Sequence, residues 1–173
     1  MPFIELDVLN APERPTLGID LGTTYSLVAL WREGRPQVLR PAGRPDGRIP
    51  SAIWFPSSGP PQVGWPAREH AVTNPGTTIL SVKRFMGRGL ADARADLASV
   101  PFPARETANS VIQFEAQGRA WTPQELSALI LKEVWRTASA ALGEEAPRRA
   151  VITVPAYFDE AQRAATRDAA RLA

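Results

Sequence analysis

The most chemically suggestive residues lie in one short segment near the N-terminus, GIDLGTT, which spans residues 18–24. A carboxylate, Asp20, is followed there by Gly22 and by the hydroxyls of Thr23 and Thr24. A glycine at a tight turn lets the backbone approach a ligand closely, so that successive N–H groups and hydroxyls can cradle a phosphate. The carboxylate suits Mg²⁺ and its water shell. The alternative is an ordinary Gly-Thr turn with a hydrogen-bonded aspartate, and the segment is neither a Walker A loop nor a GxGxxG motif.

Lysine is scarce in this chain, which has 18 arginines but only two lysines, Lys83 and Lys132. A site that handles phosphoryl groups uses a compact, mobile positive charge near the phosphate, and lysine supplies one. Lys83 is therefore a second candidate site residue. The alternative is a solvated helix residue, which is what we expect of Lys132.

The composition excludes several classes of site. The 173 residues contain no cysteine and one histidine, so disulfides, thiolate sites and a multi-histidine zinc site are excluded. That histidine, His70, is expected on an exposed helix surface. A net charge of +2 with dispersed arginines predicts no nucleic-acid partner, and no apolar run is long enough to span a membrane. Residues 1–15 lack the features of a signal peptide and predict a flexible leader on a cytoplasmic protein.

The elements that must position these residues begin with a meander over residues 16–40. Three short apolar segments follow one another so closely that only antiparallel pairing is possible. The second, residues 25–31, is almost continuously apolar, so we expect both of its faces to be covered. Beyond it, the pattern predicts a strand over 51–55, helical pieces over 67–72 and 79–85, and a hairpin over 111–121.

Two helices have clear start signals. Thr122 and Glu125 form a capping box, with apolar residues at helical spacing behind it, and Gly143 is a natural stop. A second capping box, Asp159 to Gln162, opens another helix. Between the helices, residues 150–154 predict a buried strand that ends at Pro155. The last helix reaches residue 173 without a C-cap, and we expect a cut in a longer protein there.

Four segments resemble the DnaK-type, 70-kDa heat-shock chaperone family, in family order and at family spacing. They are GIDLGTTYSLVAL (18–30), VGWPAREHAVTNP (63–75), SVKRFMGR (81–88) and AVITVPAYFDEAQRAATRDAARLA (150–173). The similarity covers residues 16–173. The long leader and the segments SVKRFMGRGLAD and DEAQRAATRDAARLA look like the HscA branch, which serves iron–sulfur cluster assembly. Tyr25 is more often seen in the general chaperones.

The resemblance implies an α/β fold, the first lobe of an actin-like ATPase. Residues 16–49 and 122–173 would form a ribonuclease-H-like subdomain, a mixed sheet with flanking helices. Residues 50–121 would form a smaller, inserted α+β subdomain. The second lobe, with its own phosphate loop, and the substrate-binding domain have no counterpart in the sequence.

The resemblance also implies roles for individual residues. The residues implied to contact the phosphates are Gly22, Thr23, Thr24 and Tyr25, with Thr23 nearest the γ-phosphate. Asp20 would hold Mg²⁺ through water, and Lys83 would position the γ-phosphate and the attacking water. Pro155 and Arg163 match the family's switch, which relays the nucleotide state to the substrate domain.

The cofactors implied are ATP or ADP with Mg²⁺, and K⁺ as a further ion. The partners implied are a J-domain co-chaperone, a nucleotide-exchange factor and, for the full-length parent, client proteins. The parent family hydrolyses ATP to ADP and phosphate, whereas one lobe alone is expected to be inactive and to expose an apolar inner face. The alternative is a truncated, non-catalytic binding module for a co-chaperone or for the parent. A sugar kinase of the same superfamily lacks the Lys83 segment and the segment at 154–158.

Overall fold

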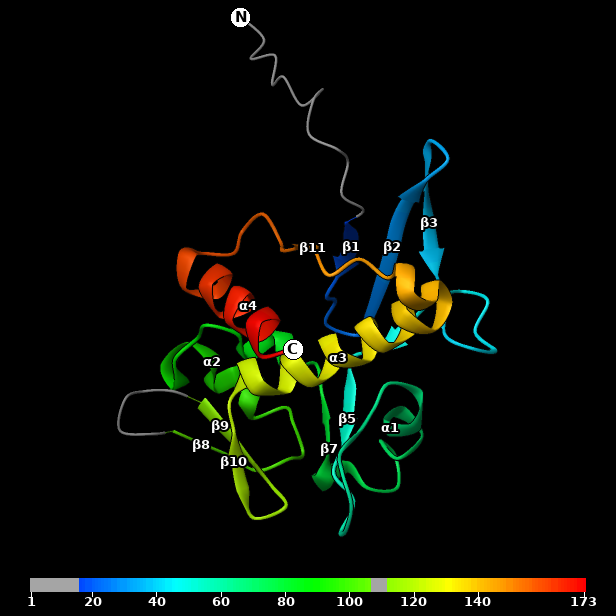
Figure 1. The fold of residues 1–173 in the computed structure, drawn as a ribbon. Helices are drawn as coiled ribbons and strands as arrows, with labels where there is room; N and C mark the ends of the chain where they lie inside the picture. The colour runs from blue at the N-terminus through cyan, green and yellow to red at the C-terminus, as the bar shows by residue number, and fades with distance from the viewer. Residues whose placement is uncertain (1–15, 107–111) are drawn as a thin grey trace, which may run out of the picture.

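One mixed sheet contains the strands before and after the N-terminal turn, and four of its strands pair side by side. The computed structural model describes residues 16–106 and 112–173 (Figure 1). The meander is confirmed, because β1 (Leu17–Asp20), β2 (Tyr25–Arg32) and β3 (Arg35–Leu39) pair in antiparallel order. A late strand, β11 (Ala150–Thr153), lies parallel to β1, and the order is β11-β1-β2-β3. The short β4 (Ile49–Pro50) pairs with the start of β2.

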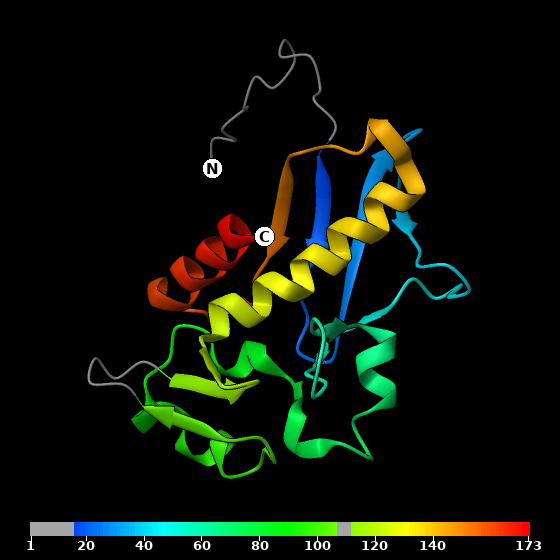
Figure 2. The same ribbon diagram turned by 60° about the horizontal axis from the view of Figure 1, so that its bottom comes forward.

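Helix α3 (Pro123–Leu142) crosses one face of this sheet, as Figure 2 shows. Its predicted capping box is present: the Thr122 hydroxyl accepts from the Glu125 N–H, and the Glu125 carboxylate accepts from the Thr122 N–H at 2.8 Å. Leu126, Ile130 and Val134 are buried at helical spacing. The helix ends at Gly143, whose φ of 61° suits glycine, and one turn of 3₁₀ helix, η3 (Gly143–Glu145), follows.

The expectation that both faces of β2 are covered is wrong. Burial alternates along the strand, and Trp31 near its end is 66% exposed. Val28 and Leu30 lie in the core, whereas Leu27 and Ala29 on the other face are half-buried. The reason is that α3 covers one face of the sheet, and no described element covers the second in the same way. A continuous apolar run reflects the composition of a strand. It does not show how many other elements pack against that strand.

The expectation of a buried strand over 150–154 is also wrong. Within the described residues β11 pairs with β1 alone, and Val151 is 62% exposed. The strand is therefore at the edge of the sheet, and only Ile152 is half-buried. Apolar, β-branched residues suit central and edge strands alike, so the sequence pattern could not separate the two.

The segment between residues 50 and 121 forms two small sheets beside the large one. In the first, β5 (Ala52–Trp54) lies between β6 (Gln62–Val63) and β7 (Thr78–Leu80). In the second, β9 (Ile112–Ala116) lies between β8 (Ala104–Glu106) and β10 (Arg119–Trp121). The β9–β10 pair confirms the predicted hairpin from residue 112 onward, while residue 111 lies outside the described residues. The connecting helices are α1 (Trp65–Glu69), η1 (Pro75–Thr77), η2 (Val82–Phe85) and α2 (Leu90–Leu97).

Two local expectations in this segment need correction. Residues 79–85 are not one helical piece, because Ile79 pairs with Ile53 in a strand and only Val82–Phe85 form a turn of 3₁₀ helix. Short apolar runs fit a strand as well as a helix, and the long-range pairing decides. His70 is half-buried and not exposed: its ring stacks on Trp54 with centroids 3.5 Å apart.

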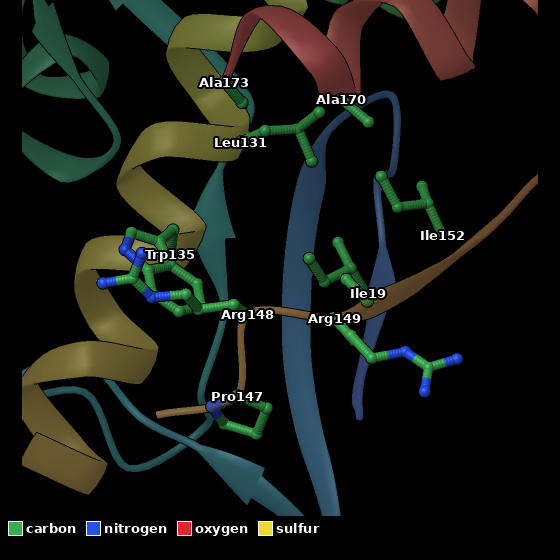
Figure 3. A pocket seen from close by; sticks show the side chains of 10 residues that line it. Ile19, Leu131, Trp135, Pro147, Arg148, Arg149, Ile152, Ala170 and Ala173 are labelled. Carbon is green, nitrogen blue, oxygen red and sulfur yellow. The ribbon is translucent and has the colours of Figure 1, made fainter. Parts of the chain in front are cut away.

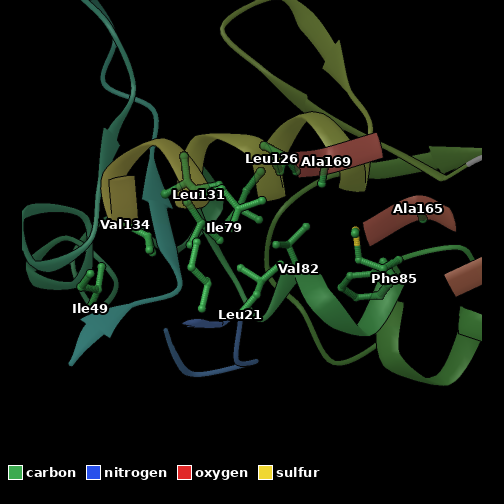
Figure 4. Close-up of a cluster of buried hydrophobic side chains, with 14 of the residues drawn as sticks. Leu21, Ile49, Ile79, Val82, Phe85, Leu126, Leu131, Val134, Ala165 and Ala169 are labelled. Atoms are coloured by element: carbon green, nitrogen blue, oxygen red, sulfur yellow. The ribbon is translucent and has the colours of Figure 1, made fainter. Parts of the chain in front are cut away.

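Helix α4 (Glu160–Leu172) packs against α3 and completes the core. Its capping box is confirmed, with the Gln162 N–H donating to the Asp159 carboxylate at 2.8 Å. One cluster of buried side chains joins α3, α4, the large sheet and η2 (Figure 4). Its members include Leu21, Ile49, Ile79, Val82, Phe85, Leu126, Leu131, Val134, Ala165 and Ala169. None of the helices in the described ranges combines the length and apolarity needed to cross a bilayer.

Candidate functional site

The turn between β1 and β2 folds so tightly that only glycine fits at position 22. A Cβ built on Gly22 would lie 2.0 Å from the carbonyl oxygen of Tyr25, which is far inside van der Waals contact. Thr23 is half-buried and Thr24 is exposed, so both hydroxyls lie near the surface of the turn. The predicted tight turn at the end of the strand is therefore present, and a role in holding phosphate stays a prediction.

Sequence reasoning missed Ser51, which holds this turn from the protein interior. Ser51 is 3% exposed, its hydroxyl donates to the carbonyl of Gly22 at 2.7 Å, and its N–H donates to the carbonyl of Thr24 at 2.9 Å. In the sequence, Pro50-Ser51 gives no sign of this contact, because the two ends of the bond are 29 residues apart.

Thr23 and Lys83 line the same cleft, which has a volume of about 310 Å³. Four parts of the chain meet there: the turn after β1, the η2 segment with the residues that follow it, helix α2, and the segment that leads into α4. The structure thus brings together two of the sequence-predicted site residues that are 60 positions apart. The other lining residues are Arg84, Arg88, Asp96, Tyr157, Phe158 and Gln162.

Lys83 carries a positive charge that is partly removed from water. Burial lowers the pKa of its ammonium group, and the negative charge of Asp20 opposes this by raising it. The Lys83 Nζ lies 5.5 Å from the centroid of the Phe158 ring, within the range of a cation–π contact. An anionic ligand close to this half-buried ammonium group would stabilise its charged form.

Asp20 lies at the end of β1, and its carboxylate accepts a hydrogen bond from the Thr153 hydroxyl at 3.1 Å. The two residues are register partners across the parallel β1–β11 pair. Asp20 is exposed, so its remaining oxygen lone pairs face water. In the part of the chain that the structure describes, no three histidine or carboxylate side chains group as metal ligands. Asp20 thus suits a cation held through water and ligand oxygens.

Tyr25 points away from this cleft. Its ring lies 6.2 Å from that of Trp65, and the guanidinium of Arg48 lies over it at 4.9 Å. The tyrosine side chain is not among those lining the cleft of Thr23 and Lys83. A phosphate contact from position 25 would therefore involve the backbone.

Arg163 ties the segment between β11 and α4 to the first turn of α4. Its Nε donates to the carbonyl of Phe158 at 3.0 Å, and its Nη2 donates to the carbonyl of Ala156 at 3.3 Å. The Phe158 N–H donates to the carbonyl of Pro155 at 3.1 Å. Pro155 and Arg163 are thus joined through one short segment, whose Phe158 side chain lines the cleft.

A second cavity, of about 470 Å³, lies between α3, α4 and the β1–β11 edge (Figure 3). Its lining is largely apolar, with Ile19, Leu131 and Trp135 among the residues labelled in Figure 3. Arg148 and Arg149 border it and are exposed, as the sequence predicted. This cavity contains none of the predicted site residues.

A tight glycine turn, a carboxylate at a strand end and a half-buried lysine thus lie near one another, beside a mixed sheet with helices. The model of the family described as Hsp70 protein matches residues 16–173. The chain belongs to the Hsp70 family. Proteins of this family are ATP-dependent chaperones with an actin-like ATPase fold, and the mixed sheet with helices is consistent with that fold. They generally bind ATP or ADP with Mg²⁺, J-domain proteins and nucleotide-exchange factors.

Proposed function

We propose that residues 16–173 form the first lobe of the nucleotide-binding domain of an ATP-dependent chaperone and bind the phosphates of ATP or ADP. The observation that carries this proposal is that Thr23, in the tight turn of Gly22, lines the same cleft as Lys83. The division into a subdomain of residues 16–49 and 122–173 and a smaller one of 50–121 is part of the proposal. Figure 2 is consistent with it, since the small sheets lie beside the large one.

Each site residue has a proposed task. The turn of Gly22, Thr23 and Thr24 directs N–H groups and hydroxyls at phosphate oxygens. Asp20 would hold Mg²⁺ through water, and the bound ion would neutralise phosphate charge. The ammonium of Lys83 holds the terminal phosphate and orients the attacking water. An anion there would stabilise the charged form of this lysine, which burial disfavours.

Pro155 and Arg163 are proposed to relay the state of the cleft. Arg163 donates hydrogen bonds to the backbone carbonyls of Ala156 and Phe158. The Phe158 side chain lines the cleft and lies near Lys83. A change in the position of Lys83 would therefore alter the position of this segment. The two hydrogen bonds of Arg163 would transmit it to α4.

The finer assignment has two versions. The HscA-like version, with a role in iron–sulfur cluster assembly, rests on the segments at 81–92 and 159–173. The alternative is a non-catalytic binding module for a co-chaperone or for a parent chaperone. In either version this chain alone is expected not to turn over ATP, because catalysis requires preorganised donors on both sides of the phosphates.

The test is a calorimetric titration of the 173-residue chain with Mg-ADP and Mg-ATP. Gly22→Ala should abolish the binding heat, because the added Cβ collides with a backbone oxygen. Gly18→Ala is the matched control: its Cβ meets its nearest neighbour at 3.8 Å, an ordinary contact, and binding should persist.

The two lysines provide a second matched pair. Lys83→Ala should weaken binding, whereas Lys132→Ala, on the exposed face of α3, should not. Heat that persists unchanged in Gly22→Ala and Lys83→Ala would contradict this site. No heat with the unmodified chain would contradict nucleotide binding by this chain and favour the binding-module alternative.

A further inference from the structure

We infer that Ser51 is the positioning residue of the phosphate turn, an inference that rests on the proposed function of that turn. Ser51 touches the turn at two carbonyls, those of Gly22 and Thr24, and contacts no part of the cleft itself. Ser51 follows β4, whose residue Pro50 pairs with Tyr25 of β2, so the serine backbone is itself held by the sheet.

The direction of the hydrogen bonds around Ser51 follows from its chemistry. A hydroxyl has one proton, and Ser51 uses it on the Gly22 carbonyl at 2.7 Å. The 3.0 Å contact between the hydroxyls of Ser26 and Ser51 must then have Ser26 as its donor. The result is a buried chain from Ser26 to Ser51 to Gly22, in which each bond polarises and strengthens the next.

Fixing a carbonyl also fixes the N–H on the other side of the same peptide bond. In a planar trans peptide the C=O and N–H point in opposite directions. With the carbonyl of Gly22 turned to the buried Ser51, the N–H of Thr23 is directed to the exposed side of the turn. By the same argument, the Ser51 N–H bond to the Thr24 carbonyl directs the N–H of Tyr25 away from Ser51.

The hydrogen bonds of Ser51 therefore determine which side of the turn presents backbone N–H donors. Without its hydroxyl, the peptide between Gly22 and Thr23 keeps no side-chain bond that holds it in this orientation. If this peptide rotates, its carbonyl oxygen takes the place of the N–H on the ligand side of the turn. A carbonyl oxygen repels phosphate oxygens. Tyr25, whose ring points away from the cleft, can take part in the site through this backbone orientation.

The experiment compares Ser51→Ala and Ser51→Thr with the unmodified chain. It first records the backbone amide NMR signals of residues 22–25 without ligand and then the affinity for Mg-ADP by calorimetry. In Ser51→Ala the amide signals of Thr23 and Tyr25 should shift and exchange faster, and the affinity should fall roughly ten-fold. Ser51→Thr keeps the hydroxyl and should restore most of both.

Thr78→Val is the matched control. It removes another buried hydroxyl that donates to a carbonyl, that of Asn74 at 2.8 Å, in the small sheet. It should lower the stability of the chain while leaving both the amide signals of the turn and the affinity unchanged. If Ser51→Ala does not fold, Ser26→Ala replaces it, because the loss of the donor to Ser51 should move the same amide signals by a smaller amount.

The outcomes separate this inference from the proposed function. Unshifted amide signals of Thr23 and Tyr25 in folded Ser51→Ala would overturn the inference, whatever the affinity. An affinity that falls equally in Ser51→Ala and Thr78→Val would overturn it too. An unmodified chain that does not bind Mg-ADP would overturn the proposed function, while the ligand-free amide comparison would still decide whether Ser51 orients the turn.

Discussion

At the scale of single residues, the charge of Lys83 is set by two opposing effects. Burial disfavours the ammonium form and lowers its pKa, while the negative charge of Asp20 raises it. Burial is the larger effect, so the pKa stays below its ordinary value. The second lysine, Lys132, is exposed on α3 and provides an internal reference.

Asp20→Asn should lower the pKa of Lys83 further. The variant keeps a side-chain oxygen that can accept from Thr153 but removes the charge that favours the ammonium form. The measurement is an NMR titration of the Lys83 side chain in the unmodified chain and in Asp20→Asn. A pKa of Lys83 that is unchanged or higher in Asp20→Asn would contradict the electrostatic coupling of these two residues.

The same pKa has a consequence for stability. Between the lowered pKa of folded Lys83 and the ordinary value of the unfolded chain, the unfolded chain binds more protons. The contribution of Lys83 to the free energy of unfolding therefore rises with pH in that window. Below the folded pKa, the full cost of the buried charge is present. Urea unfolding at about pH 8 and about pH 10 should show this rise, and Lys83→Met should remove it.

At the scale of elements, the η2 segment reaches the cleft because Gly87 lets it approach α4. A Cβ on Gly87 would lie 2.6 Å from both the Cα and the N of Gln162, and the residue has a φ of +65°. Beside it, the Arg88 guanidinium pairs with the Asp96 carboxylate at 2.7 Å and ties η2 to α2. The segment that contains Lys83 and Gly87 thus packs closely against the first turn of α4.

Gly87→Ala should lower the free energy of unfolding by about 2–4 kcal/mol, the sum of backbone strain and overpacking. Gly118→Ala is the matched control, because its φ of +68° imposes similar strain but nothing lies within 4 Å of its Cβ. That variant should lose only about 1 kcal/mol. Urea unfolding measures both, and equal losses would show that the approach to Gln162 does not matter.

At the scale of the whole molecule, the sheet ends at β11 within the described ranges, and this edge lies next to an apolar cavity. Strand β11 exposes Val151, and the cavity lined by Ile152, Trp135 and Ala170 adjoins it (Figure 3). An apolar edge strand offers unpaired backbone groups to another chain. We therefore expect any tendency of the chain to associate to lie at this edge.

Val151→Lys should reduce self-association of the chain, because a charge on an edge strand opposes pairing with a second edge. Val72→Lys is the control, since Val72 is 89% exposed but lies outside every strand. Sedimentation velocity over a range of protein concentrations measures the effect. Equal behaviour of the two variants would mean that general charge, not the β11 edge, controls association.

The amino-acid sequence was sufficient to predict the features that depend on neighbouring residues. Both capping boxes, the stop at Gly143 and the three-stranded meander follow from contacts within a few positions, so local pattern is sufficient. The segment around Gly22 and the scarcity of lysine also pointed to two residues that line one cleft, Thr23 and Lys83.

The features that depend on pairing between distant residues could not be predicted before the fold was known. Residues 78–80 form a strand because β5 is beside them, β2 has one covered face because α3 crosses one side, and β11 lies at an edge. Ser51 holds the phosphate turn through hydrogen bonds that span 29 positions in the chain. The energy of such contacts depends on which distant segments pack together. A local sequence pattern does not contain this information.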